Sequence, residues 1–165
     1  MPRPFRLALA LAAVALGPAC GTFDNEAQRT FENTALLLQP EGFTETADDG
    51  TVVSRDADDW RVGPAFVGRV QVVTPPVPNP ADRSDRVAIQ LYTQGVPGGL
   101  VLYTINARGD LLLIDERPDA TAEGFYELSF FGSEATGGGG NGLYRLVVLD
   151  GSQRVLTYGD VSIGG

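Results

Sequence analysis

The chain has 165 residues, a formal net charge of −9, a single cysteine and no histidine. Its 12 basic residues are all arginine, so lysine is absent as well. The lack of histidine excludes Ser-His-Asp hydrolysis, Cys-His chemistry, HExxH metalloprotease sites and ordinary zinc sites. The lack of lysine excludes Schiff-base catalysis and a phosphate-binding loop that ends in Lys-Ser or Lys-Thr. The negative charge opposes binding to nucleic acid.

Carboxylate chemistry is the catalytic class that survives these exclusions, chiefly glycoside hydrolysis by a pair of Asp or Glu side chains. However, 21 acidic residues supply such a pair almost anywhere in the chain. The presence of a pair is therefore not evidence of catalysis. We therefore predict that the protein is not an enzyme, with carboxylate-based glycoside hydrolysis as the alternative.

The N-terminus has the pattern of a bacterial export signal. Arg3 and Arg6 precede an uncharged apolar stretch, and small residues then lead to Cys20. About ten apolar residues are too few for a membrane-spanning helix, which needs about 20. The segment resembles the lipobox of bacterial lipoproteins, whose cysteine is diacylated on sulfur, although Leu16 stands four positions before Cys20 rather than three. The alternative is ordinary secretion, in which cleavage leaves Cys20 with a free thiol.

This interpretation divides the chain into three parts. Residues 1–19 are predicted to be a lipoprotein signal peptide, residues 20–33 a polar tether on the lipid anchor, and residues 34–165 one folded domain. A single cysteine leaves no disulfide within the mature chain, so burial and hydrogen bonds must stabilise the domain. In the lipoproteins that the segment resembles, Gly21 in place of Asp after the cysteine implies transport to the outer membrane.

Short apolar runs separated by Gly, Pro, Asn and Asp begin at residue 34, a pattern typical of β-strands joined by turns. Where the alternation can be tested, Val70 and Val72 alternate with Arg69 and Gln71. No window shows a sustained amphipathic helical period. The predicted strands are residues 34–38, 66–73, 87–92, 100–105, 111–114, 125–131, 143–149 and 155–163.

The segments between these runs predict how the strands are joined. Glycine in residues 106–110 and 150–153 indicates two tight hairpins. The glycine-rich residues 132–142 predict a longer, flexible hairpin connection, and the proline-rich residues 74–80 predict a stiff one. Together these features predict an all-β fold, an antiparallel two-sheet β-sandwich of jelly-roll or Ig-like type with about eight strands.

Several segments resemble the bacterial pre-peptidase C-terminal (PPC) domain. Residues 33–62, with their Asp-x-Asp-aromatic element, resemble its start, and residues 100–112 resemble its strand, turn and strand. Residues 142–148 resemble its closing Gly-x-Tyr-x-Leu-x-Val strand. A second resemblance, to carboxypeptidase-regulatory, transthyretin-like sandwiches, rests on residues 68–70 and 124–128. Both resemblances imply an accessory module without catalysis.

A cluster of aspartates makes calcium the only cofactor that the sequence suggests. Asp56, Asp58 and Asp59 lie close together in the chain, and hard cations such as calcium prefer carboxylate oxygens. The cluster lacks the spacing and the terminal glutamate of an EF-hand loop. The alternative is a solvated acidic loop whose aspartates set a turn before Trp60.

Two further patterns have both a functional and a structural interpretation. Aromatic rings could form a sugar-stacking platform, but the alternation places Tyr126 and Tyr144 on apolar faces, which favours core packing. The Arg108-Gly109-Asp110 tripeptide occurs in integrin ligands, but glycine and aspartate are also expected in a hairpin turn. The aromatic residues considered are Trp60, Tyr92, Tyr103, Tyr126, Tyr144 and Tyr158.

The sequence thus predicts a lipid-anchored protein of the bacterial cell envelope that acts as a non-catalytic binding or structural module. Its expected partners are the membrane, through Cys20, and an envelope protein or glycan, but not nucleic acid. An exposed apolar patch or open sheet edge would indicate protein interaction. Aromatics and carboxylates that converge on one loop end would indicate a calcium or carbohydrate ligand, and two carboxylates in a cleft would indicate an enzyme.

Overall fold

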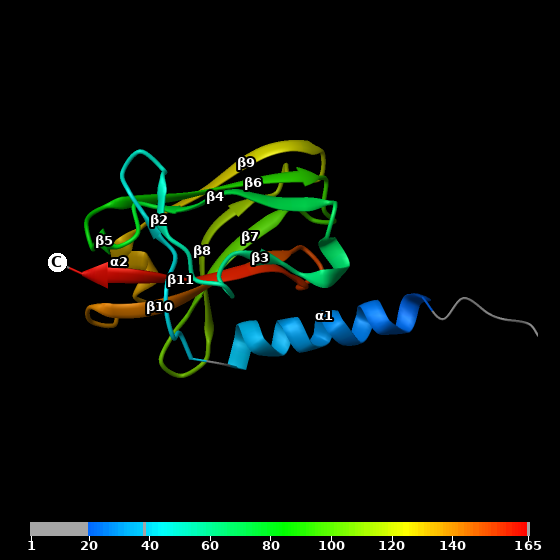
Figure 1. Ribbon diagram of the computed structural model, residues 1–165, viewed down its shortest axis with the longest axis horizontal. Coiled ribbons are helices and arrows are strands. Elements are labelled where there is room, and N and C mark those ends of the chain that lie inside the picture. Colours follow the sequence, from blue (N-terminus) through cyan, green and yellow to red (C-terminus); the bar gives the residue numbers. More distant parts are fainter. Residues whose placement is uncertain (1–19, 38, 165) are drawn as a thin grey trace, which may run out of the picture.

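The structure is a computed structural model that describes residues 20–37 and 39–164. The predicted signal peptide, residues 1–19, lies outside the described residues. The chain forms three layers, in which a helix covers one face of a six-stranded sheet and a three-stranded sheet covers the other face (Figure 1). The all-β, sandwich-like fold predicted from the sequence is confirmed.

The larger sheet has the strand order β3-β11-β10-β7-β8, with β5 also paired to β11, and the smaller sheet has the order β4-β6-β9. All strand pairs are antiparallel except β5 with β11. Strands β1 and β2 form a separate small hairpin. The elements are α1 (Cys20–Leu37), β1 (Glu45–Thr46), β2 (Val52–Ser54), β3 (Arg61–Val62), η1 (Pro64–Phe66), β4 (Val70–Val77), β5 (Ala81–Asp82), β6 (Arg86–Gln94), β7 (Leu100–Ile105), β8 (Leu111–Arg117), β9 (Glu123–Phe131), α2 (Gly132–Ala135), β10 (Gly142–Asp150) and β11 (Val155–Gly164).

Seven of the eight predicted strands are present, and β7 has the predicted bounds. The predicted hairpins at residues 106–110 and 150–153 join β7 to β8 and β10 to β11. Four strands were not predicted, namely β1, β2, β3 and β5, because two or three residues are too few to show an alternation.

The predicted strand at residues 34–38 is wrong, because α1 continues to Leu37 and Leu38 lies outside the described residues. The whole of the predicted tether, residues 20–33, also lies within α1, and its second half packs on the domain. Gln28, Phe31 and Ala35 are buried at the three- and four-residue spacing of one helix face. This face contains one aromatic, one alanine and one amide, so it lacks the apolar period that reveals most amphipathic helices.

Two predicted connections also differ. Strand β4 begins at Val70, after η1, and continues through Pro75 and Pro76, where a stiff linker was predicted. Proline is tolerated there because β4 is an edge strand, whose outward positions need no ladder hydrogen bond. Residues 132–142 do not form a hairpin, since they cross from β9 in the smaller sheet to β10 in the larger sheet through α2.

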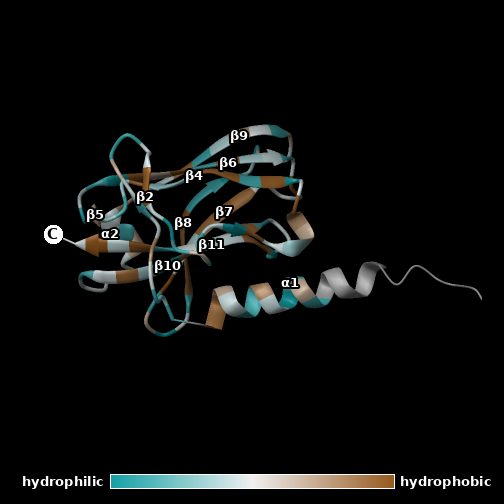
Figure 2. Cartoon of the chain, in the orientation of Figure 1, coloured by the Kyte–Doolittle hydropathy of each residue, from teal (hydrophilic) through white to brown (hydrophobic). Residues whose placement is uncertain are grey.

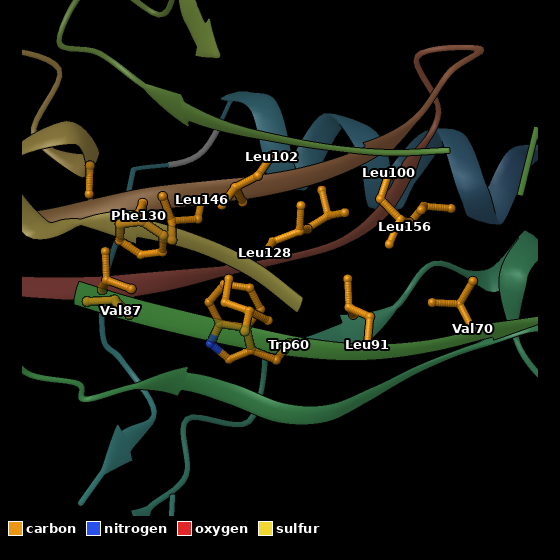
Figure 3. Close-up of a cluster of buried hydrophobic side chains, with 14 of the residues drawn as sticks. Trp60, Val70, Val87, Leu91, Leu100, Leu102, Leu128, Phe130, Leu146 and Leu156 are labelled. Carbon is orange, nitrogen blue, oxygen red and sulfur yellow. The ribbon is translucent and has the colours of Figure 1, made fainter. Parts of the chain in front are cut away.

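The larger sheet has two hydrophobic faces and therefore two cores. The inter-sheet core lies between the sheets and includes Val87, Leu91, Leu128, Leu102 and Leu146 (Figure 3). The helix-side core lies between α1 and the larger sheet and consists of Phe31, Ala35, Val147, Leu149, Val155 and Tyr158. Figure 2 shows polar and apolar residues alternating along the described part of α1 and apolar segments within the sheets. Because β10 is covered on both faces, its run from Leu146 to Leu149 is apolar at every position.

Trp60 enters the inter-sheet core through a gap left by a glycine. Its side chain is buried, and Figure 3 shows the indole ring pointing into the layer between the two sheets. The backbone N–H of Trp60 donates to the Tyr158 carbonyl at 2.7 Å. The backbone of Trp60 has a positive φ of 57°. A Cβ atom on Gly159 would overlap the indole ring. The glycine in the middle of β11 is therefore required by the tryptophan beside it.

We expect Gly159→Ala to lower the free energy of unfolding by about 3 kcal/mol, the upper range for overpacking a core. The new methyl group and the Trp60 ring would occupy the same space. Gly164→Ala is the matched control in the same strand, since no atom lies within 4 Å of the added Cβ. Urea unfolding measures both variants. Equal stability of the two variants would contradict this account of Trp60.

Candidate functional site

A buried ion pair joins β10 and β11 on the helix-covered face of the larger sheet. Arg145 and Asp160 are cross-strand partners. Arg145 Nε and Nη2 donate to the two Asp160 carboxylate oxygens at 2.6 and 2.8 Å. The side chains are only 4% and 3% exposed. Burial lowers the pKa of Arg145, but the hydrogen bonds and charge of Asp160 outweigh it and hold that pKa above its ordinary value, so the guanidinium remains charged.

Arg145 also connects the ion pair to α1. Its Nη1 donates to the Thr34 carbonyl at 3.3 Å, in the last turns of the helix. The guanidinium lies 5.0 Å from the centre of the Tyr158 ring, which in turn packs against Phe31 at 4.9 Å. The helix therefore covers a charged group as well as an apolar face.

Two buried polar side chains close the free edge of β11 in the gap between β3 and β5. Asp59 accepts the Asp160 N–H at 2.9 Å and the Thr44 N–H at 2.7 Å. Asn79 donates to the carbonyls of Asp160 and Thr44 and accepts the Ser162 N–H. Both side chains satisfy backbone groups that have no strand partner there. Their role in the structure is to complete a sheet edge.

Burial raises the pKa of Asp59 to about 7, and the charge of Asp160 acts in the same direction. The hydrogen bonds from the Thr44 and Asp160 N–H groups oppose this rise. Between the ordinary value of 3.8 and about 7, the folded protein holds a proton that the unfolded chain has released. The contribution of Asp59 to stability is therefore complete below that ordinary value and declines as the pH rises towards about 7.

We expect Asp59→Asn to be less stable than the parent at about pH 5, and the difference to shrink at about pH 8. The amide supplies one oxygen where the carboxyl group accepts two N–H bonds, but it carries no charge to bury at high pH. Urea unfolding at the two pH values measures the difference. Glu116→Gln, which removes one exposed charge, should show no such trend. A pH-independent difference for Asp59→Asn would contradict the raised pKa.

The three calcium candidates do not converge on a common point. Asp59 is buried and its oxygens are bonded to backbone N–H groups, whereas Asp58 is exposed. The Asp56 carboxylate accepts the Asp58 N–H at 3.2 Å, as in a turn-forming aspartate. The hydrogen bond between the two side chains lowers the pKa of Asp56 and raises that of Asp58. Within the described part of the chain, no three His, Cys, Asp or Glu side chains gather as a metal site.

The aromatic residues do not form one platform either. Trp60 and Tyr158 are buried, and Tyr126 and Tyr144 pack against the inter-sheet core. Tyr92 alone of the six pairs with an exposed ring, Phe125, at 5.2 Å. The segment of residues 108–110 lies in the β7–β8 turn, as the hairpin interpretation predicted, and the Asn106 side chain accepts the N–H groups of Arg108 and Asp110.

A pocket of about 400 Å³ lies where the C-terminal end of α1, the tip of the β7–β8 hairpin and the start of β10 meet. Figure 1 shows the hairpin tip beside the end of the helix. The wall combines polar and apolar groups in about equal measure. Its lining includes Leu36, Leu37, Ile105, Leu143, Asn106 and Arg108. Sequence reasoning missed this pocket because it depends on α1, which was not predicted.

Strand β8 borders the same end of the molecule and exposes three consecutive leucines. Leu111, Leu112 and Leu113 are 40%, 36% and 58% exposed. Leu111 and Leu113 pair with Ile105 and Tyr103, which face the helix-side core, so Leu112 points to the other face of the sheet. An apolar residue at every position was the signal in the sequence, since a half-solvated strand should alternate.

No protein-family model matches the chain, and no curated protein matches its sequence. Among the described residues, no helix is long and apolar enough to cross a membrane. Cys20 is the first residue of α1, but its side chain lies outside the described part of the structure.

Proposed function

We propose that the protein is a lipid-anchored, non-catalytic interaction module of the bacterial cell envelope, attached to the outer membrane through Cys20. The open edge of the larger sheet at β8 carries this proposal, because it is the feature that indicates a protein partner. The export signal and the lipobox-like residues support localisation to the cell envelope. The calcium and carbohydrate alternatives gain no comparable support, since neither the aspartates nor the aromatic rings converge.

The edge at residues 111–114 of β8 lacks the protection found at the edges of β11, β4 and β9. Strands β3 and β5, with Asp59 and Asn79 between them, cover the edge of β11. The edge of β4 contains two prolines and two irregularities in register. Proteins protect edges in these ways to prevent unwanted strand pairing. By contrast, residues 111–114 contain no proline and no charge.

The edge of β9 is protected by carboxylates. Asp115 accepts the Ser129 N–H at 2.8 Å, and Glu134 accepts the Phe131 N–H at 2.7 Å. Asp115 belongs to β8 itself, so the C-terminal half of β8 closes against β9. The exposed part of the β8 edge is thus confined to the leucines, which are followed by a register shift. A short, apolar and defined edge suits one specific partner strand.

The helix gives the proposed anchor a fixed relation to the domain. An 18-residue helix is about 27 Å long, and Figure 1 shows the N-terminal end of α1 extending past the sandwich. Phe31 and Arg145 fix the other half of α1 to the larger sheet. Where a polar tether was predicted, a rigid arm would hold the domain in one orientation to the membrane.

The anchor is tested by mass spectrometry of the mature N-terminus. We expect a diacylglyceryl group on Cys20 and recovery of the protein with outer-membrane fractions. Gly21→Asp is the matched control, since that residue after the cysteine should retain the same lipidated chain in the inner membrane. A free thiol on Cys20 would refute the anchor and leave the interaction module as a separate question.

The interaction surface is tested with a photoreactive phenylalanine analogue placed at Leu113 in the native envelope. We expect a protein adduct from this position, because a partner strand at β8 would lie against it. Val67, which is 71% exposed and lies outside the β8 surface, is the control position. An absence of adducts from Leu113, or equal adducts from both positions, would refute a partner at this edge.

A further inference from the structure

The direction of the free backbone groups on β8 follows from the β7–β8 turn. The Asn106 N–H donates to the Asp110 carbonyl at 3.1 Å, so these two residues form a hydrogen-bonded pair. Hydrogen-bonded and non-hydrogen-bonded pairs alternate along an antiparallel ladder. Leu112, opposite Thr104, therefore bonds to β7, while the N–H and C=O groups of Leu111 and Leu113 point away from it.

From this geometry we propose that β8 pairs with β8 of a second copy of the chain, in an antiparallel dimer whose two-fold axis passes through Leu112. Leu111 of each copy exchanges backbone hydrogen bonds with Leu113 of the other. The two Leu112 residues then face each other as a non-hydrogen-bonded pair. The inference rests on the interaction surface of the proposed function and names its partner.

A second copy fits because the edge is complementary to itself. The outward donors and acceptors belong to two residues placed symmetrically about Leu112, so an inverted copy meets them in register. Leucine meets leucine on both faces of the joined sheet. Asp110 of each copy lies opposite Ile114 of the other, so the pairing sets no like charges directly opposite. A different partner protein would need an exposed strand with the same pattern of outward N–H and C=O groups. A second copy of this chain already has that strand.

The anchors are compatible with this symmetry. Directly opposite residues of an antiparallel pair lie on the same face of the sheet, so the two-fold axis is perpendicular to the sheet. Both α1 helices then lie on one face of the joined sheet and point in opposite directions. If both copies are lipidated at Cys20, a single membrane beneath the helix layer accommodates both lipid groups.

The test is disulfide trapping in the native envelope with Leu112→Cys. Non-hydrogen-bonded partners have Cα atoms about 4.5 Å apart, within the range that a disulfide spans. We expect mild oxidation to convert most of the variant to a covalent dimer at twice the monomer mass. Leu111→Cys and Leu113→Cys are the matched controls. In these variants the two identical cysteines lie diagonally across the strand pair from each other. Their Cα atoms are more than about 8 Å apart, which is beyond the reach of a disulfide.

A second variant tests the hydrogen bonds themselves. Leu113→Pro removes an N–H that points outward, so β8 keeps its ladder with β7. Combined with Leu112→Cys, it should abolish the covalent dimer while the chain keeps the thermal unfolding midpoint of Leu112→Cys alone within a few degrees. A dimer that persists in the double variant would overturn the proposed pairing.

The remaining outcomes separate this inference from the proposed function. A monomer from Leu112→Cys, or dimers of equal yield from positions 111, 112 and 113, would overturn the symmetric pairing. If the Leu113 photoreactive probe still forms an adduct in that case, the interaction module stands with a different partner. If it forms none, both proposals fail together. The unsubstituted chain controls for Cys20, which is identical in every sample.

Discussion

The buried pair of Arg145 and Asp160 is the constraint around which the larger sheet is organised. A buried ion pair is stable only where further hydrogen bonds satisfy both partners, because removing two charges from water costs several kcal/mol each. Arg145 therefore uses Asp160, the Thr34 carbonyl and the Tyr158 ring together. The covering helix excludes water from the pair, and the pair holds the end of that helix in place.

The same pair positions the segment that completes the inter-sheet core. The backbone N–H of Asp160 donates to the Asp59 carboxylate. Trp60, which follows Asp59 in the chain, donates its backbone N–H to the Tyr158 carbonyl. Trp60 then turns its ring over Gly159 into the space between the sheets. Polar groups on the helix side thus determine how an aromatic side chain on the other side is placed. A few residues of β11 therefore link the two cores energetically. Changes in the free energy of unfolding caused by substitutions at these residues should not add.

The sequence predicts most of the fold because the strands obey a two-residue period, as in β6 and β9, and because glycines mark the hairpins. It does not predict α1, because Gln28 binds the Val155 carbonyl and the Thr34 carbonyl binds Arg145 only after the sheet exists. The aspartates show the same limit. Asp56, Asp58 and Asp59 look equivalent in sequence, but one of them is turned inward to cap backbone N–H groups. A cluster of aspartates in the sequence shows how many carboxylates are close together in the chain. It does not show which way each side chain points in the fold.

With the proposed lipid anchor, confinement to a membrane would change what the short edge at β8 can achieve. A contact of about three residues from each copy buries far less than the roughly 1,200 Å² of a standard stable interface, so it would be weak between copies in solution. Anchored copies would share one plane, which would raise their effective concentration without any new contact. A flexible tether would waste much of this gain, because each copy would sample all orientations. The rigid docking of α1 would hold both edges in the membrane plane, so the ion pair that secures the helix would also prepare the edge for the proposed pairing.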